Sequence, residues 1–294
     1  MNQQGRTNVI PECQRPDPNP RAPRLRAPPG AVDTHLHIFG PETEYPFLPV
    51  RRFTPPDATV ESYLTLHRTL GLSRAVLVQA SMYGTDNRRQ LDAAARMDIP
   101  TRTIVVVPLT ISDAELADLH ARGARGVRFI TTQPGGLPVD QLDSFAARIG
   151  SLGWHIQLML SPDHLIELAP RLVNLSCPIA IDHIGDVRSA QGTGQPAFRA
   201  LLRLLEGGRC WVKLSAGYHH SDQVPPYRDT IPLVHALVAA RADRLFWGSD
   251  WPHPNHPGTM PNSTDLFDLM LDWVPDEGTR NRILVDNPER FYGF

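Results

Sequence analysis

The sequence has 294 residues, of which 41% are hydrophobic and 20% are charged, and its formal net charge at pH 7 is −2. This composition is typical of a globular protein with a large core, in one large domain or two ordinary ones. It excludes two classes of protein. No basic run is interleaved with aromatic residues as in nucleic-acid-binding proteins, and no apolar stretch is long enough to cross a bilayer.

The N-terminus and the cysteines indicate the compartment of the protein. The first residues, MNQQGRTNVIPECQRP, lack the apolar core of a signal peptide. Cys13, Cys177 and Cys210 are far apart, odd in number and without C-x-x-C spacing. This argues against a disulfide framework and fits a reducing environment, so we expect a cytoplasmic protein.

Residues 1–30 are rich in Pro and Arg and show no hydrophobic period, which predicts an extended N-terminal arm. From residue 31 onwards, short apolar runs alternate with helix-like stretches. The runs are β-branched or apolar nearly throughout, as expected for parallel strands that are buried on both faces. They lie at residues 31–39, 74–81, 101–108, 126–132, 154–160, 178–185, 210–217 and 244–252.

The helix-like stretches fall between these runs, and one of them, at 112–126, opens with a Ser cap and an acidic first turn. Eight strands alternating with helices over about 260 residues predict one α/β domain at 31–294, a (β/α)8 TIM barrel. A doubly wound open sheet is the alternative. It is disfavoured because HLHIFGPETEYPF follows the first strand where a glycine-rich phosphate loop would be needed.

Polar residues interrupt the apolar runs at the carboxyl ends of six strands, where the active site of such a barrel lies. His35 and His37 are two residues apart in the first strand, so their side chains should point to the same face. Buried charges are costly unless they are paired or used, so this distribution indicates a functional site. The other members are Ser81, Tyr83, Arg128, Asp182, His183, Lys213, Ser215, Asp250 and His253.

An ordered set of motifs resembles the amidohydrolase superfamily: the H-x-H of the first strand, DHIG at 182–185 and GSDWPHP at 248–254. Within it, VDTHLHIFGP, VLVQASMYGTDN, GVRFI, IDHIG and WGSDWPHPN are similar to the branch that contains 2-pyrone-4,6-dicarboxylate lactonase. Relatives in that branch include 4-sulfomuconolactone hydrolase and galactarolactone isomerase. The resemblance covers all of the chain except the N-terminal arm.

The resemblance implies a catalytic role for four residues. Asp250 corresponds to an aspartate that takes a proton from the attacking water, a task that suits a carboxylate within hydrogen-bond reach. His35, His37 and His183 match histidines that surround the ester carbonyl. They are expected to stabilise the tetrahedral oxyanion, directly or through a metal.

The resemblance also implies substrate-binding residues. Arg128 matches an arginine that grips a substrate carboxylate, for which a planar guanidinium is well shaped. Ser81 and Tyr83 lie on a loop that touches the substrate in the family. His253 is a candidate for binding the substrate or, alternatively, a brace for the loop after the last strand.

The chain departs from the dicarboxylate lactonases in its arginines. Those enzymes use further arginines shortly after the fourth strand and on the loop after the seventh, where this chain reads RFITTQPGG and SAGYHHSDQ. The second loop offers His219 as a substrate-binding candidate, and Met159 stands in place of a fifth-strand tyrosine. These differences argue against the pyrone dicarboxylate itself and favour a smaller or differently charged lactone.

The sequence does not decide whether the site holds a metal ion. His35, His37, His183 and Asp250 could hold one Zn or Mn ion with a free position. The resemblance implies that members with a firmly held metal add a fourth-strand lysine or glutamate, or a fifth-strand histidine. This chain has Arg128 on the fourth strand and Gln157 or Met159 on the fifth. No organic cofactor is expected.

We therefore expect a hydrolase that opens a small anionic lactone, of muconolactone or pyrone type, in aromatic catabolism. A lactone isomerase acting on a sugar-acid lactone and a non-catalytic ligand-binding barrel are the alternatives. Three further residues have structural interpretations. Arg128 and Asp182 could form a structural ion pair, Asp182 is expected to face away from His183, and Lys213 could be structural or bind substrate. The sequence leaves the formation of a homo-oligomer open.

Overall fold

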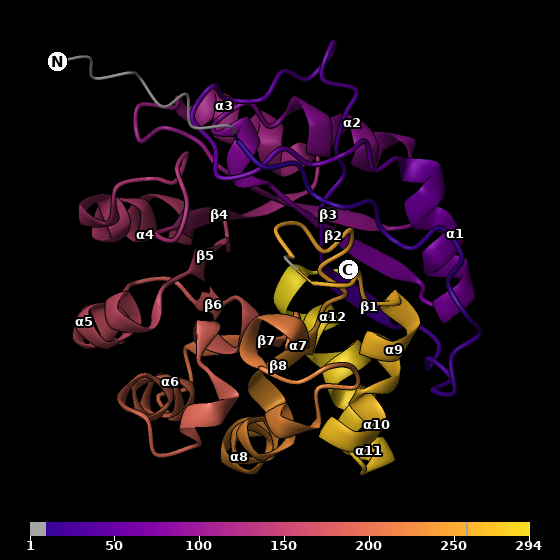
Figure 1. Cartoon of the computed structure of the whole chain (residues 1–294). Helices are drawn as coiled ribbons and strands as arrows, with labels where there is room; N and C mark the ends of the chain where they lie inside the picture. Colours follow the sequence, from indigo (N-terminus) through magenta and orange to yellow (C-terminus); the bar gives the residue numbers. More distant parts are fainter. Residues whose placement is uncertain (1–9, 257) are drawn as a thin grey trace, which may run out of the picture.

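A computed structural model describes residues 10–256 and 258–294 of the chain. In this part of the chain, eight parallel strands follow one another around a barrel in sequence order, with helices outside them (Figure 1). The predicted (β/α)8 TIM barrel is thus confirmed. The strands are β1 (Val32–Leu36), β2 (Arg74–Val78), β3 (Thr101–Val105), β4 (Ala124–Ile130), β5 (His155–Met159), β6 (Ile179–Ile181), β7 (Cys210–Leu214) and β8 (Leu245–Trp247).

The barrel closes beyond the end of the short strand β8. A bridge pairs Leu36 with Trp251, and the Asp250 N–H donates to the His35 carbonyl over 2.8 Å. Gly248 permits this approach, because a Cβ at this position would lie only 2.7 Å from the Cβ of His35. Closure of the sheet therefore places the GSDWPHP segment directly beside the H-x-H pair.

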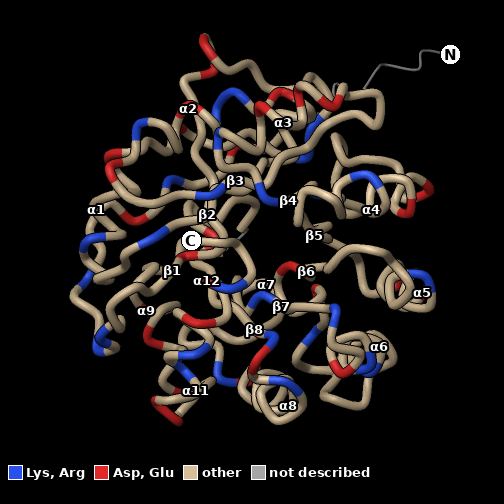
Figure 2. The backbone as a smooth tube through the Cα atoms, turned by 180° about the vertical axis from the view of Figure 1, so that it is seen from behind, with Lys and Arg blue, Asp and Glu red and all other residues tan. Residues whose placement is uncertain are grey.

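The helices cover the outside of the barrel, and many of the charged residues belong to them (Figure 2). The predicted Ser112 cap is present as a capping box, in which Ser112 and Glu115 bond each other's backbone N–H. Short helices that the sequence pattern does not predict, α7, α9 and α10, follow β7 and β8. The helices are α1 (Val60–Leu70), α2 (Arg88–Arg96), α3 (Asp113–Ala121), α4 (Leu142–Gly150), α5 (Pro162–Leu172), α6 (Pro196–Glu206), α7 (Gly217–His220), α8 (Ile231–Arg241), α9 (Ser263–Asp268), α10 (Met270–Trp273), α11 (Glu277–Asn281) and α12 (Asn287–Tyr292).

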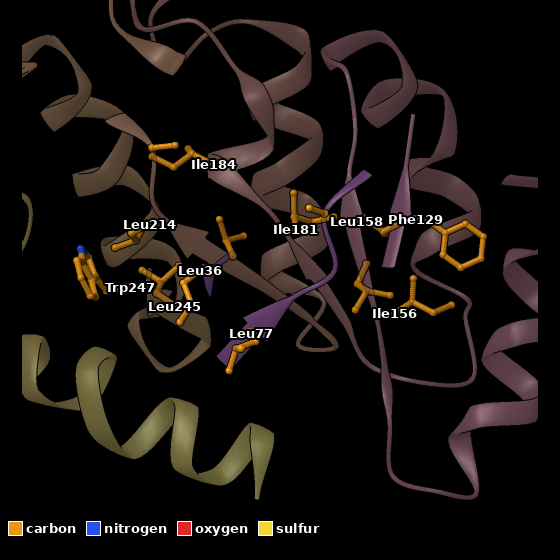
Figure 3. Close-up of a cluster of buried hydrophobic side chains, with 14 of the residues drawn as sticks. Leu36, Leu77, Phe129, Ile156, Leu158, Ile181, Ile184, Leu214, Leu245 and Trp247 are labelled. Carbon is orange, nitrogen blue, oxygen red and sulfur yellow. The ribbon is translucent and has the colours of Figure 1, made fainter. Parts of the chain in front are cut away.

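Most of the core lies between the strands and the surrounding helices. Leu36, Leu77, Leu158, Ile181 and Leu214 are almost fully buried in this layer (Figure 3). Full burial of each such side chain contributes about 1.5–3 kcal/mol relative to exposure, so this layer is a main source of stability. Alternation along each strand then directs the intervening side chains into the barrel.

A second apolar cluster fills the barrel interior at the amino-terminal ends of the strands. The last helix, α12, closes this end, and the C-terminus lies near the barrel axis (Figures 1 and 2). The ring of Tyr292 lies 5.4 Å from that of Phe246, and Phe291 packs on Trp211. This end of the barrel is plugged, so a substrate can reach the interior only from the opposite end.

Residues 10–30 run along the outside of the barrel. Glu12 pairs with Thr54 through a β-bridge, and Asp268 of α9 accepts hydrogen bonds from the backbone of Arg24 and Leu25, each 2.9 Å long. These contacts tie the described part of the Pro-rich segment to the loops at the carboxyl end of the barrel. None of the helices in the described residues has the length and apolar character needed to cross a membrane.

Candidate active site

A cavity that is partly open to solvent lies at the carboxyl ends of the strands. It brings together six of the nine predicted site residues, from six different strands or the loops after them, and His35 lies directly beneath them. The lining residues are His37, Phe39, Phe53, Ala80, Ser81, Met82, Arg128, Ile130, Gln133, Met159, His183, His219, Asp250, Pro254 and Asn255.

The two histidines of the H-x-H pair point to one place, as strand alternation predicts. Their Nε2 atoms lie 3.3 Å apart. Nδ1 of His37 lies 2.7 Å from the carbonyl oxygen of Val78, which can only accept, so Nδ1 carries the proton and Nε2 faces the cavity as an acceptor. The register of β1 against β2 shifts between Asp33 and Leu36, which places one extra residue in β1 next to the site.

His183 is presented by a stretch of left-handed backbone after β6. His183, Ile184, Gly185 and Asp186 have φ values of 47°, 48°, 70° and 55°. Non-glycine residues avoid this region, and such strain clusters at functional sites. The turn directs Nε2 of His183 toward Asp250 Oδ1, 3.7 Å away, while Nδ1 lies 2.8 Å from the Ser215 hydroxyl.

The prediction that Asp182 faces away from His183 is wrong. β6 ends at Ile181, and the left-handed turn that follows breaks strand alternation. Both side chains therefore point into the barrel, with Asp182 one layer below His183. Asp182 Oδ1 lies 3.3 Å from Nδ1 of His35.

Asp250 lies at the centre of the cluster, and its backbone is also left-handed, with φ 56°. Its Oδ1 is 3.6 Å from Nε2 of His35 and 3.8 Å from Nε2 of His37. Burial raises the pKa of Asp250 to about 7, even though a hydrogen bond from the Tyr218 hydroxyl to Oδ2 opposes the shift. A carboxyl group with this pKa exchanges protons readily near neutral pH.

Tyr218 is the contact that the motifs do not reveal. It belongs to α7, the short helix after β7, and its ring is buried against His219 and His253. Tyr218 follows Ser215, just after the end of β7, by three residues, and this position in the sequence could have identified it as a candidate site residue.

Burial keeps the three histidines around Asp250 neutral. It lowers the pKa of His35 to about 3 and the pKa values of His37 and His183 well below their usual range. Neutral imidazoles offer lone pairs or single N–H donors to the cavity.

Beneath the cavity lies a layer of paired charges. Arg128 donates to Asp182 Oδ2 from Nε and Nη2, over 3.2 and 3.0 Å, and to the Gln79 carbonyl from Nη1. The ion pair considered from the sequence is therefore present, while Arg128 also lines the cavity. Burial opposes ionisation of Asp182, but the positive charges of Arg128 and Lys213 outweigh it and hold the pKa of this carboxyl well below its usual range.

Two predicted residues lie behind the cavity wall. Tyr83 accepts a hydrogen bond from the Gly40 N–H through its hydroxyl, and its ring packs on Phe47. His253 is fully buried, with Nε2 2.7 Å from the Ser263 hydroxyl. Neither is among the lining residues, and the contact with Ser263 fits the alternative that His253 braces the loop after β8.

The residues around Asp250 fit a single divalent ion. Nε2 of His35 and Nε2 of His37 lie 3.6 and 3.8 Å from Asp250 Oδ1, and the two nitrogens are 3.3 Å apart, so these three residues form one possible ligand group. Such separations match ligands that each lie about 2.0–2.2 Å from one Zn²⁺. His183 belongs to a second group, with His35 and Asp182. Asp182 next to His35 Nδ1 and Val78 O next to His37 Nδ1 are the outer-shell acceptors that metal-bound histidines use.

Comparison with known proteins agrees with this arrangement. A model of the amidohydrolase family matches residues 32–294. The chain belongs to the amidohydrolase family. The match covers the whole barrel, from the H-x-H strand to the C-terminal helix.

Individual relatives of this amidohydrolase are similar over nearly their full length. It is 38% identical to a 4-sulfomuconolactone hydrolase from Hydrogenophaga intermedia, over 97% of this chain and 96% of the relative. It is 31% identical to a D-galactarolactone isomerase from Agrobacterium fabrum, over 94% and 93%. A solved structure of a probable 2-pyrone-4,6-dicarboxylic acid hydrolase from Acinetobacter baumannii, with citric acid bound, superposes with a TM-score of 0.80 at 30% identity, covering 90% of this chain and all of that one.

Proposed function

We propose that this amidohydrolase opens a small anionic lactone by hydrolysis, with Asp250 as the general base. The observation that carries the proposal is the convergence of three neutral histidines on one buried carboxyl group with a pKa near 7. The names of the similar proteins, two hydrolases and an isomerase of lactones or pyrones, support the same substrate class.

Asp250 and His37 can orient the attacking water between them. Asp250 Oδ1 and His37 Nε2 are both acceptors and lie 3.8 Å apart, so one water molecule can donate one hydrogen bond to each of them. Its lone pairs then point away from both residues, toward a carbonyl carbon placed in the cavity. As the bond between the water oxygen and the carbonyl carbon forms, the water proton that is hydrogen-bonded to Asp250 transfers to the Asp250 carboxylate.

The ring opens when the tetrahedral intermediate collapses. The bond from the carbonyl carbon to the ring oxygen breaks, and the protonated Asp250 returns its proton to the leaving oxygen. The Tyr218 hydroxyl, bonded to Oδ2, keeps the carboxyl group oriented through both transfers. The products are one new carboxylate and one hydroxy or oxo group.

Arg128 on the cavity wall favours a substrate with an anionic group. Arg128 and Lys213 carry two positive charges beneath the cavity, and Asp182 compensates one of them. When Asp250 is ionised as the base, it balances the second positive charge, so the guanidinium of Arg128 on the cavity wall is the group that can pair with a substrate carboxylate. His219, Gln133 and Asn255 add neutral hydrogen-bonding groups to the wall, which also contains apolar Phe39 and Ile130.

A divalent ion, if bound, would be held by His35, His37 and Asp250, and it would lower the pKa of its water and polarise the carbonyl. The residues that position the substrate, Arg128 and the cavity wall, would act in the same way in that case. Asp250 would still be the group that moves the proton.

A lactone panel tests the proposal. Purified protein is incubated with muconolactones, pyrone carboxylates and sugar-acid lactones, with and without chelator, and proton release is followed with a pH indicator. We expect acid release from at least one anionic lactone and loss of that activity in Asp250→Asn. Proton NMR of the product separates hydrolysis from isomerisation, because isomerisation gives a second lactone and no new acid. Absence of turnover across the panel would contradict the proposal.

A further inference from the structure

Lys213 of β7 is the only lysine in the sequence, and the other 28 of the 29 Lys and Arg residues are arginines. It is also fully buried, inside the barrel beneath the active-site cavity. A single lysine, in a chain that uses arginine everywhere else, indicates a place that needs a compact ammonium group. Its three N–H donors point in three directions, whereas a guanidinium is planar and larger.

The ammonium group of Lys213 has three acceptors around it, one for each N–H. The carbonyl oxygen of Thr34 and Oε1 of Gln157 each lie 2.8 Å from Nζ. The third is Nδ1 of His35, 3.4 Å away. Asp182 Oδ1 is farther from Nζ, at 3.7 Å, which is beyond hydrogen-bond distance.

The position of Asp182 supports this assignment. Its Oδ1 lies 3.3 Å from Nδ1 of His35, yet it has no hydrogen-bond partner among the described residues. A ring N–H on Nδ1 would therefore not be aligned with this oxygen. The bond that the geometry allows at Nδ1 is the one donated by Lys213.

With Nδ1 as an acceptor, neutral His35 must carry its proton on Nε2. In the protein without substrate, this N–H can donate to Nε2 of His37, 3.3 Å away, because Nδ1 of His37 donates to the Val78 carbonyl. The attacking water takes over this acceptor when it binds. One consistent chain of hydrogen bonds thus leads from Lys213 through His35 and His37 to the carbonyl oxygen of Val78, at the end of β2. The opposite tautomer of His35 would leave two lone pairs facing each other.

We propose that Lys213 is a positioning residue that keeps the ring proton of His35 on Nε2 and thereby weakens metal binding by the H-x-H pair. Nε2 of His35 can bind a metal only after its proton moves to Nδ1, where the ring then faces the ammonium donor. In that state Asp182 Oδ1, 3.3 Å from Nδ1, could accept the Nδ1–H only after the ring or the carboxylate turns. Lys213 and Asp182 therefore determine whether Nε2 of His35 carries a proton and acts as a donor, or has a free lone pair and can bind a metal.

The first test uses the metal-free wild-type protein and needs no substrate. Labelling with ¹⁵N-lysine gives one side-chain ammonium signal, because the chain has one lysine, and nuclear Overhauser contacts locate the neighbouring ring. In ¹⁵N-histidine-labelled protein, the His35 signals are assigned by their loss in His35→Gln. We expect the proton on Nε2 of His35, and a proton on Nδ1 would overturn the proposal.

The second test measures Zn²⁺ affinity by competition with a chromogenic chelator. Lys213→Met should bind Zn²⁺ about 10- to 100-fold more tightly, the range typical of a change in a ligand's outer-shell partner. Gln157→Met is the matched control, because it removes a polar group from the same layer but keeps the contact between Lys213 and His35. Equal gains in both variants, or none in a folded Lys213→Met, would overturn the proposal. If Lys213→Met does not fold, the tautomer in the wild-type protein decides. Neither readout depends on lactonase activity.

Discussion

His35 and His155 are two buried histidines at opposite ends of the barrel interior. Burial lowers the pKa of each to about 3, so both are neutral. His35 lies beneath the cavity, within 3.6 Å of the Asp250 carboxylate. His155 packs at the plugged end, with its ring centre 4.4 Å from that of Phe291. Burial and pKa therefore do not distinguish a catalytic histidine from a packing one, whereas a cavity and a facing carboxylate do.

The same division applies to the two ends of the barrel as a whole. The carboxyl ends of the strands hold charged and polar residues around the cavity, and the amino ends hold aromatic rings closed by α12. Loss of a group at the first end should reduce activity, and loss at the second should reduce stability. Four substitutions test this division.

The largest effect is expected for Asp250→Asn. The amide keeps the shape of the side chain but accepts no proton, so kcat/KM should fall by about 10³- to 10⁴-fold on the best lactone. The free energy of unfolding should stay equal or rise, because a buried ionisable group is removed. Steady-state kinetics and urea unfolding measure both quantities. Near-normal turnover would show that another group is the base.

At the plugged end, Tyr292→Ala should lower the free energy of unfolding by about 3–5 kcal/mol, as for other large aromatic side chains removed from a core. The turnover number of the folded fraction should remain unchanged, since Tyr292 is remote from the cavity. Tyr292→Phe is the control and should cost much less. A large loss of turnover in folded Tyr292→Ala would mean that the two ends are coupled.

His183→Ala and His253→Ala compare a histidine that lines the cavity with one behind its wall. We expect kcat/KM to fall by at least about 100-fold for His183→Ala, within the range for a residue acting in proton transfer. For His253→Ala the fall should be much smaller, with a loss of thermal stability because the contact with Ser263 is lost. The reverse order would place the reaction centre nearer the loop after β8.

The smallest effect concerns the pH dependence. Only the ionised form of Asp250 accepts a proton, so kcat/KM should rise with pH through about 7 and then level off. The hydrogen bond from Tyr218 favours the ionised form and lowers the pKa of Asp250. Such a bond to a charged group contributes about 1.5–3 kcal/mol, so Tyr218→Phe should move the midpoint at least about one pH unit higher. An unshifted profile would show that Asp250 is not the titrating group.

Much of the fold follows from local patterns along the chain. The eight apolar runs and the helical stretches between them predict the barrel and its strand order, because each buried strand needs an apolar composition. Element ends are less well predicted: the run at 178–185 contains only three residues of strand, Ile179–Ile181. The left-handed turn after it depends on the packing of β6 against its neighbours and has no local signal.

The sequence by itself determines which residue types stand at the carboxyl ends of the strands, and the H-x-H, DHIG and GSDWPHP motifs identify His35, His37, His183 and Asp250 as candidates. The tertiary structure decides which of these face each other. In the tertiary structure the side chain of Asp182 points into the barrel, and Tyr83 and His253 lie behind the residues that line the cavity. Tyr218 and Lys213 contact Asp250 and His35. The physical reason is that hydrogen-bond direction and distance depend on how separate strands and loops close around one axis, which no short stretch of sequence encodes.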